Sequence, residues 1–166
     1  MPVKSLLKPE IKKWLDKSIE SELYASNLYK YIANNLQRLG YFGCQSFFLK
    51  ESLDELSHYQ NIVDFVNDMG DMAAMPAIQK INDPINSIMD ALEISYETEL
   101  ELMRQYQRFY EIAESAKDCI TATFIIEYMQ IQRKSVGEFG DLIARFEKNK
   151  SDVFEFDKYM KKLANA

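Results

Sequence analysis

Helix-breaking residues are few in this chain, and their positions constrain the fold more than any other feature of the sequence. Five glycines and four prolines occur among 166 residues, and none of them falls within residues 10–39, 44–69 or 85–136. A β-rich domain needs a turn about every 8 to 12 residues, and glycine and proline are the usual turn residues. Such long uninterrupted stretches therefore predict an all-α fold built from long helices.

Apolar residues recur within these stretches at spacings of three and four, the pattern of a helix that buries one face. The pattern predicts long helices at about Pro9–Leu39 and Gly43–Met69. Asp83-Pro84 predicts the N-cap and first turn of a third helix, and Ser115-Ala-Lys-Asp118 resembles a capping box that opens a fourth. A final helix of about three turns is expected at Val153–Leu163.

The connections between these helices predict how they are arranged. Residues 70–83 contain Pro76 and no clear periodicity, so we expect a long crossover with apolar contacts of its own. Two helical hairpins joined by one long connection predict a four-helix bundle. We expect a single domain over residues 1–166, with the bundle at about 9–148. The short C-terminal helix, at about 152–164, is not expected to belong to the bundle.

Composition excludes several classes of partner. The chain has 26 acidic and 20 basic residues, a formal charge of −6, which argues against nucleic-acid binding and favours metal cations. Cys44 and Cys119 are too few for a disulfide scaffold and fit a reducing cytoplasm. No segment approaches the roughly 18 apolar residues of a membrane span, and no secretory signal is apparent at the N-terminus. We therefore expect a cytoplasmic protein with no membrane partner.

Ionisable residues on the apolar faces are the most informative feature for function. Glu22, Glu55 and Glu99 lie near the midpoints of three expected helices, and Gln132 lies near the middle of the fourth. His58 is the only histidine and follows Glu55 by three residues. A buried carboxylate costs several kcal/mol unless a positive group meets it. Carboxylates at matching depth on three helices therefore predict a metal site in the core.

The spacing also predicts how ligands are shared. Residues three apart lie on one helix face, so Glu55 and His58 can bind the same ion. Glu22 would complete that ion's ligands, and Glu99 would hold a second ion with Glu55 as the bridge. Oxygen and nitrogen donors suit Fe(II), with manganese and zinc as competitors. An isolated Glu-x-x-His pair is more often structural. A tyrosine such as Tyr29 is more often a core residue, but Tyr29 lies two turns after Glu22 and can face the site. Glu51 fits a surface group as well as a ligand.

The segment LLKPEIKKWLDKSIESELYASNLY resembles the first helix of ferritins, and most closely that of bacterial non-heme ferritins. ESLDELSHYQNIVDFVNDMG resembles their second helix and VFEFDKYMKKL their short terminal helix. The resemblance implies a hollow shell of 24 subunits that stores ferric mineral. It implies that dioxygen or hydrogen peroxide oxidises Fe(II) at a site for two iron ions in each subunit. The ligands implied are Glu22, Glu55, His58, Glu99 and Gln132, with Tyr29 beside them.

Differences between this sequence and the motifs of related ferritins narrow the kind of ferritin that we expect. Bacterioferritins carry a second Glu-x-x-His histidine and a heme-ligating methionine at the position of Leu56, so we expect no heme. Bacterial non-heme ferritins usually build a third iron site from acidic residues. The matching positions here hold Asp54, Ile131, Lys134 and Ser135, so we expect that third site to be absent or much weakened.

Two other functions compete with the ferroxidase and iron-storage interpretation. A ferritin-like shell with weak or no ferroxidase activity would act in sequestration, and the rate of Fe(II) oxidation in air distinguishes it. A di-metal oxygenase acting on organic substrates normally needs a second Glu-x-x-His motif. The single histidine argues against that third function.

Overall fold

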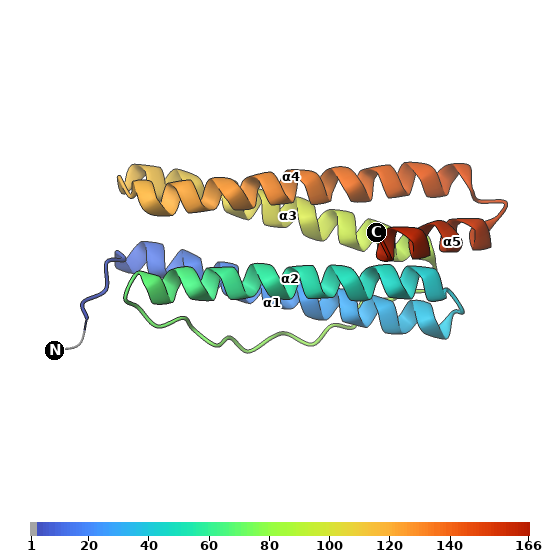
Figure 1. Ribbon diagram of the computed structural model, residues 1–166, viewed down its shortest axis with the longest axis horizontal. Coiled ribbons are helices and arrows are strands. Elements are labelled where there is room, and N and C mark those ends of the chain that lie inside the picture. The colour runs from blue at the N-terminus through green and yellow to red at the C-terminus, as the bar shows by residue number, and fades with distance from the viewer. Residues whose placement is uncertain (1–2) are drawn as a thin grey trace.

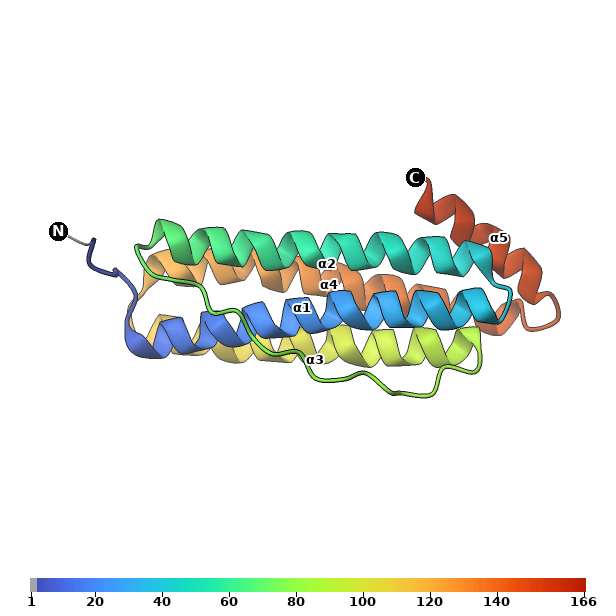
Figure 2. The same cartoon turned by 90° about the horizontal axis from the view of Figure 1, so that it is seen from below.

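The structure is a computed structural model that describes residues 3–166, and its regular secondary structure is entirely helical. The helices are α1 (Pro9–Arg38), α2 (Phe42–Asp68), α3 (Ile88–Ser115), α4 (Cys119–Lys148) and α5 (Val153–Ala164). The four long helices lie side by side, and α5 lies at one end of them (Figure 1). Residues 69–87 connect α2 to α3 in the chain, and they pass along the outside of the bundle (Figure 2). The prediction of an all-α bundle with one long crossover and a short fifth helix is confirmed.

The connections determine the direction of each helix. Gly40 adopts a positive φ of 89° between α1 and α2, which a residue without a Cβ adopts at no steric cost. The helices α1 and α2 therefore form one antiparallel hairpin, and α3 and α4 form another (Figure 1). Because the crossover returns the chain along the full bundle, α3 runs parallel to α2 and antiparallel to α1. None of the described helices is both long and apolar enough to cross a membrane.

The predicted starts of two helices were wrong. Helix α3 begins at Ile88 rather than at Pro84, because the Ser87 side chain accepts a hydrogen bond from the Asp90 N–H at 3.1 Å and caps the helix there. Ile85 packs into the core as part of the crossover. The N-cap of α4 is Asp118, which accepts from the Thr121 N–H at 3.0 Å, whereas Ser115 is the last residue of α3.

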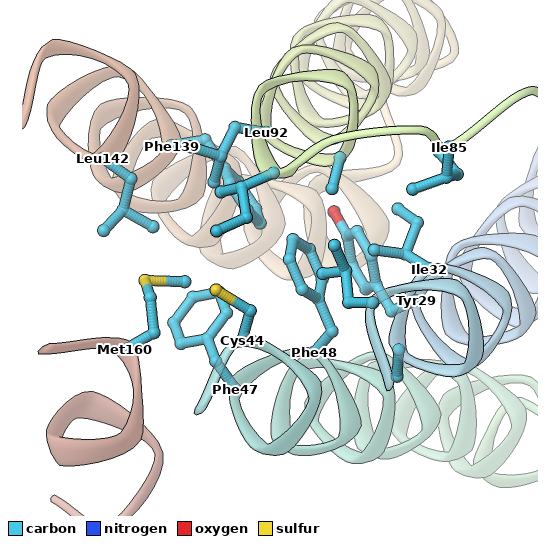
Figure 3. Close-up of a cluster of buried hydrophobic side chains, with 14 of the residues drawn as sticks. Tyr29, Ile32, Cys44, Phe47, Phe48, Ile85, Leu92, Phe139, Leu142 and Met160 are labelled. Carbon is cyan, nitrogen blue, oxygen red and sulfur yellow. The ribbon is translucent and has the colours of Figure 1, made fainter. Parts of the chain in front are cut away.

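Buried apolar side chains form two clusters, one in each half of the bundle. The first lies near the α1–α2 turn and includes Phe48, Phe139 and Phe156 (Figure 3). The second lies toward the α3–α4 turn and includes Ile62, Tyr106 and Phe109. The side chains assigned to neither cluster include buried polar groups from all four long helices, namely Glu22, Ser26, Ser52, Glu55, Ser95, Glu99 and Gln132. A polar layer therefore crosses the middle of an otherwise apolar core.

Helix α5 lies outside the four-helix bundle, as expected, and packs against the start of α2. Phe156 and Met160 are fully buried in the first cluster. The Asp157 carboxylate accepts hydrogen bonds from the Gly43 N–H at 3.0 Å and the Cys44 N–H at 2.7 Å. A Cβ at Gly43 would lie 1.9 Å from the Asp157 carbonyl oxygen, so a glycine is needed where the two backbones meet. Asp157 therefore supplies the N-terminal cap that α2 does not obtain from its own N-cap residue, Tyr41.

Replacing this cap should lower stability. We expect Asp157→Ala to reduce the free energy of unfolding by about 1 to 2 kcal/mol, because two N–H groups at the start of α2 lose their acceptor. Thermal unfolding followed by circular dichroism measures the change. The control is Lys158→Ala, which removes only an exposed ion pair with Glu155 at 3.7 Å. Equal melting temperatures for the two variants would contradict the assigned role of Asp157.

Candidate metal centre

Three side chains converge in the polar layer at the middle of the bundle. Glu22 on α1 and Glu55 and His58 on α2 each place one ligand atom within 4.8 Å of the others. The Nδ1 atom of His58 lies 3.4 Å from Glu55 Oε2 and 3.7 Å from Glu22 Oε2. Glu22 is 0% exposed and Glu55 is 2% exposed. The two carboxylates and the imidazole thus form a buried cluster of atoms that can bind a cation.

The other two expected ligands come from the second hairpin. Glu99 on α3 is fully buried, and its Oε1 accepts a hydrogen bond from the Tyr29 hydroxyl. Gln132 on α4 is also fully buried, and both amide atoms lack a hydrogen-bond partner among residues 3–166. A buried amide without a partner is costly, so its oxygen is available to a ligand. Glu99 and Gln132 lie in the same layer but do not belong to the three-residue cluster.

Burial raises the pKa of two of the three glutamates, Glu55 and Glu99. Burial and the charges of Glu22 and Glu99 raise the pKa of Glu55 well above its usual range. Burial also raises the pKa of Glu99 to about 7, although the hydrogen bond from Tyr29 opposes the shift. Within residues 3–166, no lysine or arginine forms a salt bridge with any of these three glutamates. A bound cation would supply the missing positive charge.

The backbone of His58 is held by a contact with α4. The Tyr128 hydroxyl donates a hydrogen bond to the His58 carbonyl oxygen at 2.8 Å. Burial lowers the pKa of His58, but the nearby Glu22 carboxylate outweighs this effect and leaves the pKa raised. A metal ion must displace the proton, because only a neutral imidazole nitrogen binds metal. Carboxylates with one imidazole form a donor set suited to Fe(II), Mn(II) or Zn(II).

Tyr106 is a residue beside the candidate ligands that the sequence analysis did not identify. Its hydroxyl donates a hydrogen bond to Glu22 Oε1, and its side chain is 1% exposed. The signal in the sequence was a repeated spacing, because Tyr29 follows Glu22 by seven residues and Tyr106 follows Glu99 by seven. On the antiparallel helices α1 and α3, this spacing lets each tyrosine reach the glutamate of the other helix.

A pocket of about 250 Å³ adjoins the cluster, and Glu55 and His58 form part of its wall. The pocket is also lined by Asp54, Lys134 and Ser135, which occupy the positions of the third iron site.

Glu51 and Glu138 also line the pocket, one turn away from those positions, so the pocket contains more acidic groups than the matching positions alone indicated. Burial and the charges of Glu138 and Asp54 raise the pKa of Glu51 to about 8. Because Lys134 shares the pocket, a weakened third site stays a prediction.

Comparison with protein families gives a match to the ferritin-like domain over residues 12–149. The chain belongs to the ferritin family. A bacterial non-heme ferritin of Staphylococcus aureus strain USA300 is 27% identical over 126 residues, covering 75% of this chain and 76% of the relative. One from Staphylococcus epidermidis is 24% identical over 135 residues, covering 80% and 81%.

Solved structures support the fold independently. An open pore ferritin from the hyperthermophilic archaeon Archaeoglobus fulgidus superposes with a TM-score of 0.90 at 22% identity. The match covers 93% of this ferritin-family chain and 96% of the archaeal chain. The likeness therefore includes the four-helix bundle and nearly the whole length of both chains.

The metal-free protein should lose stability as the pH rises from about 5 to about 8. Glu99 has a pKa of about 7 when folded, against an ordinary value of 4.5. Between these values the folded protein holds more protons than the unfolded chain, so raising the pH favours unfolding. For this one group the effect is on the order of 3 kcal/mol. Urea unfolding in the presence of a chelator measures it.

The variant Glu99→Gln provides the control for this pH dependence, because its amide does not titrate. We expect its stability to change less than that of the unmodified protein over the same pH range. A metal-free protein whose stability increases from pH 5 to pH 8 would contradict the assigned cause.

Proposed function

We propose that this protein stores iron by oxidising Fe(II) at a site for two ions in each subunit and enclosing the ferric product in a protein shell. One observation carries the proposal: buried carboxylates and the only histidine meet in the polar layer of a ferritin-family bundle without a salt bridge to lysine or arginine among the described residues. Iron is the substrate and cargo of this function. The bacterial relatives named as non-heme ferritins support the choice of metal.

We assign a role to each proposed ligand. Glu55 bridges the two ions, Glu22 and His58 complete the ligands of one, and Glu99 with Gln132 holds the other. Support for the bridge comes from electrostatics, because the charges of both Glu22 and Glu99 raise the pKa of Glu55. An ion on each side of Glu55 would lower the free energy of its charged form.

The pairing of ions matches the electron count of the oxidant. Each Fe(II) releases one electron, whereas reduction of dioxygen to hydrogen peroxide takes two electrons and two protons. Reduction of hydrogen peroxide to two water molecules also takes two of each. Two ferrous ions held side by side therefore supply one oxidant molecule in a single encounter. Tyr29 contributes by holding Glu99 through its hydroxyl group.

The proposed function uses no heme. Leu56 follows Glu55 at the position where bacterioferritins carry a heme-ligating methionine. A cytoplasmic location stays a prediction, and it agrees with two cysteines that are both free. The absence of nucleic-acid and membrane partners also stays a prediction, based on the charge of −6 and the low overall hydropathy.

The assignment of Glu55 can be tested by its removal. We expect Glu55→Ala to lower the initial rate of Fe(II) oxidation in air by more than about tenfold, since even outer partners of metal ligands contribute that much. Absorbance of the ferric product gives the rate. The control is Glu101→Ala, a residue of the same charge whose partners are the exposed Arg104 and Arg108.

Two outcomes would contradict this part of the proposal. Equal rates for Glu55→Ala and Glu101→Ala would show that the buried cluster is not the oxidation site. Equally slow oxidation by the unmodified protein would favour the alternative function, a ferritin-like shell that sequesters iron without rapid oxidation.

The proposed shell is a homo-oligomer of 24 subunits. Large apolar side chains remain exposed on α2, the crossover and α5, including Leu53 at 63%, Met75 at 77% and Phe154 at 67%. Exposed apolar groups on several faces are typical of surfaces that are covered on association. We propose that subunits pair antiparallel along α1 and α2, and that the α5 helices meet around four-fold axes.

Size-exclusion chromatography with light scattering tests the assembly. We expect a single species with the mass of 24 subunits at micromolar concentration. The variant Leu53→Glu should reduce that species, because it places a charge on the proposed pairing face. A monomer or dimer of the unmodified protein would contradict the shell.

A further inference from the structure

Two tyrosines and two glutamates form a reciprocal arrangement across α1 and α3. Tyr29 on α1 donates to Glu99 on α3, and Tyr106 on α3 donates to Glu22 on α1. Both phenol groups are buried, at 0% and 1% exposed. The glutamates belong to opposite sides of the proposed metal pair, so each end of the site has one tyrosine.

Each tyrosine binds one oxygen of its glutamate and leaves the other free. Tyr106 occupies Oε1 of Glu22, and Oε2 is buried with no hydrogen-bond partner in the described part of the chain. That free Oε2 lies 3.7 Å from Nδ1 of His58, so it faces the other ligands. Glu99 shows the same division, with Oε1 bound to Tyr29 and Oε2 free.

The two rings are fixed by different halves of the core. Tyr106 packs against Tyr128 with 5.1 Å between ring centroids and an interplanar angle of 38°, and it belongs to the second apolar cluster. Tyr29 packs against Phe48 and Phe139, with 5.9 Å between its ring centroid and each of theirs, in the first cluster (Figure 3). The terminal torsion of a glutamate is broad, so a free carboxylate rotates readily. A hydrogen bond from a packed phenol removes that freedom.

We propose that Tyr106 is a positioning residue that holds Glu22 so that a single oxygen, Oε2, faces the metal bound by Glu55 and His58. Tyr29 does the same for Glu99 at the other end of the site. The inference rests on the proposed function of the cluster as a metal pair and adds a residue to it. Burial and the charge of Glu22 keep the pKa of Tyr106 well above its usual range, so the phenol remains a donor.

The test uses Co(II), which reports coordination geometry through its visible absorption, added to metal-free protein without oxygen. We expect the unmodified protein to bind two Co(II) per subunit and Glu99→Gln to retain one, at Glu22, Glu55 and His58. In that background, Tyr106→Phe should weaken Co(II) binding about tenfold and change its visible spectrum. Tyr29→Phe should leave both unchanged, because its partner carboxylate has already been removed.

The reciprocal background separates positioning from general destabilisation. In Glu22→Gln, Tyr29→Phe should weaken the remaining Co(II) and Tyr106→Phe should not. A matched control is Tyr110→Phe, one turn further along α3, whose hydroxyl donates a hydrogen bond to Glu114 at 3.4 Å. This control should bind Co(II) like the unmodified protein in either background.

Failure of the inference about Tyr106 can be distinguished from failure of the proposed function. If Tyr106→Phe binds Co(II) unchanged while the unmodified protein binds two ions, the positioning role is overturned and the metal pair stands. If Tyr106→Phe weakens Co(II) equally in both backgrounds, its role is structural and the inference is overturned. If the unmodified protein binds no Co(II), both the metal pair and the inference fail.

A second measurement does not depend on the folding of Tyr106→Phe. In a crystal structure of the unmodified protein soaked with Zn(II), Glu22 should bind zinc through one oxygen while Tyr106 remains hydrogen-bonded to the other. Zinc bound through both oxygens of Glu22, with the Tyr106 hydroxyl displaced, would overturn the inference.

Discussion

The rest of this structure depends on three carboxylates that are buried in the middle of an apolar four-helix bundle. Glu22, Glu55 and Glu99 are each at most 2% exposed, and no lysine or arginine among the described residues forms a salt bridge with them. Burying an unpaired charge costs far more than a hydrogen bond returns. The polar layer is therefore tolerable only when protons or cations neutralise it, and this requirement would couple folding of the chain to the proposed metal binding.

The position of this layer explains much of the surrounding architecture. It separates the core into two apolar clusters, and each cluster contributes one tyrosine to the layer, Tyr29 from the first and Tyr106 from the second. Apolar packing on both sides holds the four long helices in register. The proposed ligands are therefore placed by rigid elements rather than by loops, as a site with fixed geometry requires.

Sequence reasoning found the residues of the site whose signal is local to one helix. Glu55 and His58 lie three residues apart, so helical geometry alone places them on one face, and the structure brings their side chains together. Sequence reasoning did not identify Tyr106, because its contact with Glu22 crosses between helices. That contact depends on α1 and α3 running in opposite directions, which the path of the crossover determines. Similarly, Glu138 lines the pocket beside Glu51 only because α4 packs against α2 at that depth.

By itself the sequence determined that this chain is all-helical, with one long crossover, and that ionisable residues occupy the apolar faces of its helices. Periodicity and helix breakers carry this information because they act over a few residues, through hydrogen bonds and burial along a single helix. Only the tertiary structure decided where α3 begins, that α5 packs against α2, and which tyrosine holds which glutamate. These features arise from contacts between residues distant in the chain, such as Asp157 with Gly43, and such contacts depend on how whole helices pack.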